Sequence, residues 1–189
     1  MRADPANPQL GSLLDGWQQD GRFRGVCCRI GGQVPEGLEE LERRAVPVDL
    51  DVEVGQLPLV SQIADRFPRL RIAIVRLGNP RFDGRLDDEW ARSVERAAKS
   101  PQAYMKVSGL LNGSPSQWSA ASFRPYVQHA LTVFGPGRVM FGSGWPRCLP
   151  AASWKETLAA FTQSIGPLPM EAREELLGGA ARRFYGMAP

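Results

Sequence analysis

The chain has 189 residues, a mass of 20.8 kDa and 43% hydrophobic residues, so we expect residues 1–189 to form a single globular domain. Its net charge of +3 comes from arginines interleaved with acids, as in GLEELERRA (37–45), which disfavours a nucleic-acid partner. No apolar run approaches the roughly 20 residues of a membrane span, and MRADPANPQ lacks a signal-peptide core, so no membrane partner and a cytoplasmic location are expected.

The predicted elements alternate between strand and helix along the chain. Short apolar runs bounded by turn residues predict five buried strands, at 24–30, 45–52, 71–78, 103–111 and 138–145. Apolar residues at helical spacing lie between or after them, within 59–67, 86–94, 126–134 and 154–161. Alternation of this kind predicts an α/β fold with a parallel sheet, either doubly wound or closed as a (β/α)8 barrel.

Several phrases along the chain, in this order, resemble the amidohydrolase-related family, in particular its lactonase-like branch. They are VDLDVEVGQL (48–57), ADRFPRLRIAIVRLGNP (64–80), YMKVSGL (104–110) and RPYVQHALTVFGPGRVMFGSGWPRC (124–148). The resemblance implies a distorted (β/α)8 barrel with its site at the carboxyl ends of the strands. It also implies hydrolysis of sugar-acid or pyrone-dicarboxylate lactones, in many members with a divalent metal such as zinc.

The chain departs from the family pattern at the positions that carry the chemistry. Members have an HxH pair, whereas this chain has one histidine, His129. The family phrase DHLGKP reads VRLGNP, with Arg76 in place of the imidazole, and FGSDWP reads FGSGWP, with Gly144 in place of the general base. Cys27 and Ala180 replace the family's usual arginine and asparagine. We therefore expect no bound metal and no other cofactor, because a catalytic zinc takes three protein ligands.

Two strands carry the remaining candidates. Lys106 should share one side of its strand with Tyr104 and Ser108, and it is a candidate catalytic residue together with Asp49. Arg76, Lys106 and Trp145 are candidate substrate-binding residues, which could hold a small anionic ligand. A structural alternative is that Asp49 and Asp51 form ion pairs with Lys106 and Arg76.

Two other residues are expected to be structural. His129 lies in the helical phrase RPYVQHAL and should be a surface or boundary position of that helix. Cys27 has no histidine partner, so we expect a reduced core thiol rather than a nucleophile.

The length of the chain is short for a complete barrel. Such a barrel takes about 250 residues, so 189 residues have room for roughly six βα units, with the first strands missing. An open barrel exposes two strand edges, which need cover from the N-terminal segment, from a partner chain or from a homo-oligomer.

Two functions remain open from the sequence. The first is a degenerate lactonase-like protein, a pseudoenzyme that binds a small anion or assembles with a partner. The second is a divergent, metal-free hydrolase or lyase that acts on a small carboxylated lactone through Lys106, Arg76 and Asp49.

Overall fold

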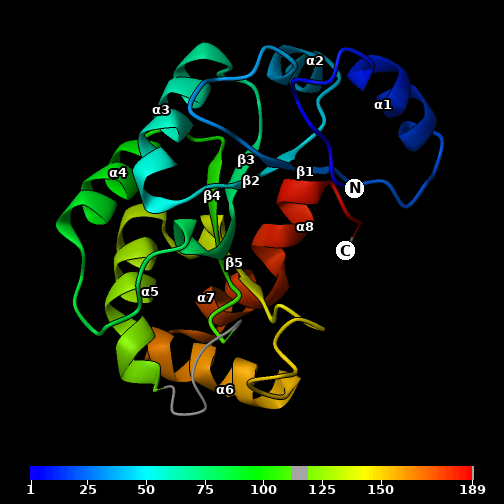
Figure 1. The fold of residues 1–189 in the computed structure, drawn as a ribbon. Coiled ribbons are helices and arrows are strands. Elements are labelled where there is room, and N and C mark those ends of the chain that lie inside the picture. Colours follow the sequence, from blue (N-terminus) through cyan, green and yellow to red (C-terminus); the bar gives the residue numbers. More distant parts are fainter. Residues whose placement is uncertain (112–118, 189) are drawn as a thin grey trace.

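The computed structural model describes residues 1–111 and 119–188, and a parallel sheet forms its centre (Figure 1). The strands are β1 (Val26–Arg29), β2 (Val48–Asp51), β3 (Ile72–Ile74), β4 (Ala103–Ser108) and β5 (Val139–Gly142). Their spatial order is the chain order, β1-β2-β3-β4-β5. A doubly wound sheet reverses its order at a switch point, so this order selects the barrel alternative, as an open segment of five strands rather than six.

Helices cover the two faces of the sheet unequally. They are α1 (Leu10–Gln18), α2 (Leu38–Arg43), α3 (Leu57–Arg66), α4 (Asp88–Ala98), α5 (Ala120–Phe134), α6 (Trp154–Ile165), α7 (Met170–Glu174) and α8 (Ala180–Tyr185). Figure 1 shows α3, α4 and α5 along one face, which we call the outer face, and α8 on the opposite, inner face. Within the described residues, no helix combines the length and the apolar character that a membrane crossing requires.

Alternation along β4 separates the two faces. Ala103, Met105 and Val107 are fully buried against the helices of the outer face, whereas Tyr104 and Lys106 are only partly buried on the inner face. Because successive side chains of a strand point to opposite sides, the polar side chains of the sheet gather inside, where α8 packs. The predicted placement of Lys106 together with Tyr104 and Ser108 is confirmed.

The strand predicted at 71–78 ends earlier, at Ile74. Four residues that follow have left-handed backbone, with φ of 53° at Arg76, 56° at Leu77, 72° at Gly78 and 52° at Asn79. Left-handed backbone cannot continue a strand, and it costs roughly 1–2 kcal/mol for each residue with a Cβ. Gly78 is required here for a second reason, because a Cβ would lie 2.7 Å from the Leu57 side chain.

The free edge of β1 is covered by the first residues of the chain. The Cys27 amide donates to the carbonyl of Met1 at 2.7 Å, and the Ala3 amide donates to the carbonyl of Cys27 at 3.0 Å. Arg2 thereby forms a parallel bridge with Cys27. Of the three kinds of cover expected for an open barrel, the N-terminal segment provides this one.

Candidate ligand-binding site

Three arginines surround one buried carboxylate at the carboxyl ends of the first strands. Asp51 ends β2 and its side chain is 3% exposed. Arg76 Nη2 donates to Asp51 Oδ1, while Arg2 Nη2 and Arg29 Nε lie 3.8 and 3.9 Å from Asp51 Oδ2. A carboxylate this deeply buried requires cationic partners, and Arg76 is the one in direct contact.

The left-handed turn after β3 fixes the direction of Arg76. The Arg76 amide donates to Ser108 Oγ at 3.3 Å, and Arg76 Nε donates to Asn79 Oδ1 at 2.7 Å. Asn79 Nδ2 in turn donates to the carbonyl of Val52 at 2.8 Å. The guanidinium is thus held by two side-chain acceptors while its own side chain stays 26% exposed.

A cavity of about 380 Å³ opens beside this turn, and we call it the carboxyl-end pocket. Its lining comprises Arg76, Asn79, Pro80, Phe82, Gly109, Leu110 and Arg147. Arg147 follows β5, and no carboxylate among the described residues pairs with its exposed side chain. Two guanidinium groups on a partly apolar lining fit a small ligand that carries a carboxylate or phosphate.

Lys106 and Asp49 form a second, separate group on the inner face of the sheet. Lys106 Nζ donates to Asp49 Oδ2 at 2.6 Å, and Tyr185 Oη donates to Asp49 Oδ1 at 2.6 Å. The ammonium also lies 4.9 Å from the centre of the Tyr185 ring. Burial and the Asp49 charge raise the pKa of Tyr185, so its hydroxyl remains a donor near neutral pH.

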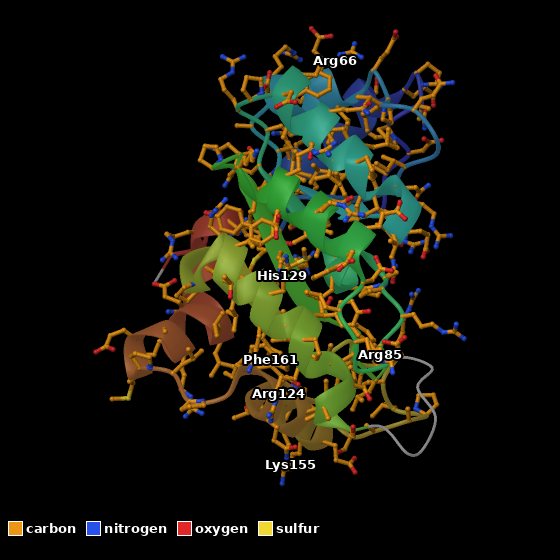
Figure 2. The ribbon with its side chains drawn as sticks, turned by 90° about the vertical axis from the view of Figure 1, so that its left-hand side faces the viewer. Arg66, Arg85, Arg124, His129, Lys155 and Phe161 are labelled. Carbon is orange, nitrogen blue, oxygen red and sulfur yellow. The ribbon has the colours of Figure 1, made fainter. Side chains whose placement is uncertain are left out.

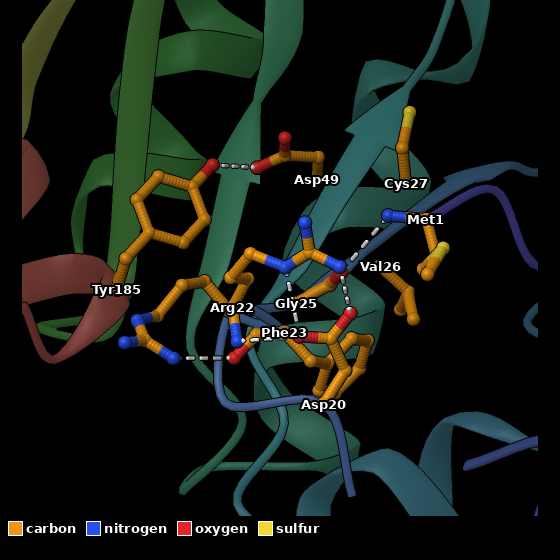
Figure 3. A pocket seen from close by; sticks show the side chains of 10 residues that line it. Met1, Asp20, Arg22, Phe23, Gly25, Val26, Cys27, Asp49 and Tyr185 are labelled. Carbon is orange, nitrogen blue, oxygen red and sulfur yellow. Dashed lines mark hydrogen bonds and ion pairs between the residues drawn. The ribbon is translucent and has the colours of Figure 1, made fainter. Parts of the chain in front are cut away.

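A different cavity, of about 560 Å³, borders this group on the side of β1 (Figure 3). Asp49, Cys27 and Tyr185 line it from the inner face, and Figure 3 shows Tyr185 directed at Asp49 and Arg22 paired with Asp20. Arg76 lines the carboxyl-end pocket and does not line this one. The three residues of the metal-free alternative therefore do not meet in one cavity. Arg76 lines the carboxyl-end pocket, whereas Asp49 lines the other cavity and is bound to Lys106.

All three cysteine thiols are expected to react slowly with iodoacetamide at pH 8 in the native protein. Burial, followed by the charges of Asp49 and Asp51, raises the pKa of Cys27, and burial raises the pKa of Cys28 to about 12. Cys148 is fully buried. Because the thiolate is the reactive form, a raised pKa slows alkylation at this pH. Mass spectrometry against a urea-unfolded control measures the three rates, and rapid native labelling of Cys27 would contradict the expectation.

The candidate residues named from the sequence do not all line one cavity. Arg76 and Lys106 lie on the same side of the sheet, but each is paired with its own aspartate, which is the ion-pair alternative weighed from the sequence. Trp145 is 65% exposed and does not line the carboxyl-end pocket. Sequence reasoning missed Arg147 and Tyr185; the only signal for them was their place in the phrases GWPRC and RRFYG.

The residues described do not fit a metal centre. Among residues 1–111 and 119–188, no three His, Cys, Asp or Glu side chains come together as ligands. Asp49 and Asp51 are each bound to a cation of the protein. His129 lies on α5 in the helical layer (Figure 2), with its ring 5.6 Å from that of Trp90, so its prediction as a boundary position of the helix is confirmed.

Comparison with known proteins gives one consistent result. The family model for amidohydrolases matches residues 9–187. An uncharacterized protein, y4mH, from Sinorhizobium fredii (strain NBRC 101917 / NGR234) is 29% identical over 202 residues, which cover 97% of this chain and 67% of that protein. L-fucono-1,5-lactonase from Burkholderia multivorans (strain ATCC 17616 / 249) is 30% identical over 166 residues. Those residues cover 80% of this chain and 55% of the lactonase.

A solved structure agrees with the sequence relatives. The crystal structure of an amidohydrolase from Burkholderia multivorans with bound zinc superposes with a TM-score of 0.82 at 27% identity. The match covers 98% of this chain and 72% of that chain. This chain therefore belongs to the amidohydrolase family, and its relatives include L-fucono-1,5-lactonases.

Proposed function

We propose that this chain binds a small organic acid at the carboxyl-end pocket and does not hydrolyse lactones through a metal. The observation that carries the proposal is the exchange of chemistry at Arg76. A guanidinium stands there in the phrase where the family resemblance expects an imidazole, and it contacts Asp51 while it lines the pocket with Arg147. A guanidinium is always charged near neutral pH, so it attracts anions and cannot coordinate a cation.

The second support comes from Gly144. This residue follows β5, has a φ of 73° and offers no side chain that could take a proton from water. Activation of water near neutral pH requires a positioned base or a metal. The proposed ligand is a sugar acid, because L-fucono-1,5-lactonase is among the relatives and lactone opening yields a carboxylate.

The alternative, a metal-free hydrolase or lyase, depends on Lys106 and Asp49 reaching the same ligand as Arg76. Lys106 and Asp49 bind each other and Tyr185, whereas Arg76 lines a different cavity. This separation favours binding over catalysis, and a hydrolysis assay distinguishes the two.

Calorimetry with L-fuconate, and a pH-stat assay with L-fucono-1,5-lactone, together test the proposal. We expect L-fuconate to bind and Arg147→Gln to weaken its binding about tenfold, the loss of roughly 1.4 kcal/mol for one charge-assisted contact. The matched control Arg85→Gln changes another exposed arginine and should leave binding unchanged. The lactone should open at the buffer rate with or without added zinc. Turnover that disappears in Lys106→Ala would establish the alternative and overturn the proposal.

A further inference from the structure

Two nitrogens of the Arg76 guanidinium already donate to acceptors of the protein. Nε donates to Asn79 Oδ1 at 2.7 Å, and Nη2 donates to Asp51 Oδ1. Among residues 1–111 and 119–188, no acceptor is bonded to Nη1. The side chain is 26% exposed and lines the carboxyl-end pocket. Both N–H groups of Nη1 are therefore left for a ligand.

The side-chain amide of Asn79 has a protein partner at each end. Its oxygen accepts from Arg76 Nε, and its nitrogen donates to the carbonyl of Val52 at 2.8 Å. An amide held at both ends keeps its oxygen directed at Arg76. Asn79 lines the same pocket as Arg76, so it stands beside any ligand there.

The backbone conformation alone does not explain this amide. Asn79 has a φ of 52°, a region that asparagine enters more readily than most residues and that glycine enters freely. Glycine would therefore satisfy the backbone, but it would leave Arg76 Nε without its acceptor. The family phrase DHLGKP has a lysine at this place, and a lysine side chain has no acceptor. In this chain, the guanidinium at position 76 thus comes together with an acceptor at position 79.

A second contact limits how the guanidinium can move. A hydrogen bond to Asp51 at Nη2 alone would let the planar group swing about that bond. The bond from Nε to Asn79 adds a fixed point on another nitrogen and so orients the plane. A side chain that is ordered before the ligand arrives loses less conformational freedom on binding.

We propose that Asn79 is a positioning residue, which holds Arg76 so that Nη1 meets the anionic group of the ligand. The inference rests on the proposed function, because it concerns the same pocket and the same ligand. Asn79 acts through Arg76, so its contribution should vanish when the guanidinium is absent.

Calorimetry with L-fuconate tests the inference on four proteins: the wild type, Asn79→Gly, Arg76→Lys and the double variant. Asn79→Gly should bind about tenfold more weakly, although the charge of the pocket is unchanged. Arg76→Lys keeps a cation for Asp51 but has no Nε, so adding Asn79→Gly to it should change the affinity less than about twofold. The control Asn7→Gly removes the same side chain from the turn before α1 and should leave binding unchanged.

A spectroscopic measurement follows the guanidinium without any ligand. In ¹H–¹⁵N NMR spectra, the Nε–H signal of Arg76 is identified by its loss in Arg76→Lys. We expect a sharp signal in the wild type near neutral pH and a signal broadened by exchange with water in Asn79→Gly. Thermal unfolding verifies that each variant is folded.

The possible outcomes separate the two proposals. If the wild type and Asn79→Gly bind L-fuconate equally, the inference is wrong and the proposed function stands. An equal loss in the Arg76→Lys background would also overturn it, since the turn and not Arg76 would then carry the effect. A sharp Nε–H signal that persists in Asn79→Gly contradicts the inference as well. If L-fuconate does not bind the wild type, both proposals fail.

Discussion

Replacement of Lys106 by methionine is expected to lower the free energy of unfolding by about 2 kcal/mol, between the values for exposed and fully buried ion pairs. The side chains of Lys106 and Asp49 are 20% and 18% exposed, so the pair is mostly buried. Without the ammonium, the hydroxyl of Tyr185 is the one side-chain donor that Asp49 keeps among the residues that the structure describes. The variant therefore leaves a charge largely desolvated and incompletely paired.

The double variant Asp49→Asn/Lys106→Met should recover most of this loss. The amide oxygen of an asparagine can still accept from Tyr185, and no uncompensated charge remains on the inner face. Urea unfolding of both variants, followed by circular dichroism, measures the two free energies. Lys155→Met changes an exposed residue of α6 and controls for the loss of a lysine. A fully stable Lys106→Met would show that the pair contributes nothing to folding, and it would return Lys106 to the list of functional candidates.

Substitution of Arg138 by alanine should lower the free energy of unfolding by about 3 kcal/mol, at least as much as Lys106→Met does. Arg138 Nη1 donates to the carbonyls of Ala98, Ser100 and Ala103 at 3.0, 2.7 and 3.2 Å, and Nε donates to that of Phe134 at 3.2 Å. These carbonyls belong to the ends of α4 and α5 and to the start of β4. One side chain thus joins α4, α5 and β4 at the amino end of β4.

The physical reason for the size of this effect is the number of acceptors that lose their donor. Burial lowers the pKa of Arg138, but the guanidinium still carries its charge near neutral pH, and hydrogen bonds from charged donors are the stronger ones. Arg138→Lys should be intermediate, because an ammonium is a point charge and cannot span four carbonyls. Urea unfolding again provides the measurement, with Arg92→Ala as control. A change below about 0.5 kcal/mol in Arg138→Ala would contradict the prediction.

The strands were more predictable than the helices. All five predicted strands exist, since apolar runs between turn residues carry a strong signal for buried parallel strands. Helix α1 was not predicted, because its nine residues include Gly11 and Gly16, which are poor helix formers. The burial of Leu10 and Leu14 stabilises it instead, and a sequence pattern does not show where that burial comes from.

The site was predictable only in part. The alternation of side chains along a strand predicted which side of the sheet Lys106 and Asp49 face. The pairing of the aspartates with cations was predictable because an unpaired buried charge is costly. The partner of each aspartate could not be predicted, because it depends on the early end of β3 and on the left-handed turn that turns Arg76 toward Asp51. Tyr185 is 136 residues from Asp49 along the chain, so no local pattern could connect them.

The left-handed turn has a consequence for how this protein could change over generations. Its shape depends on Gly78 against Leu57 and on Asn79 bound to Val52. Arg76 supports it through its amide, which donates to Ser108, and through its guanidinium, which donates to Asn79 and Asp51. A mutation at position 76 therefore alters what the carboxyl ends of the strands attract, and it also removes the direct cationic partner of the buried Asp51. Ligand preference and stability are thus coupled at this position, so we expect a change of Arg76 to be tolerated only together with a change of Asp51.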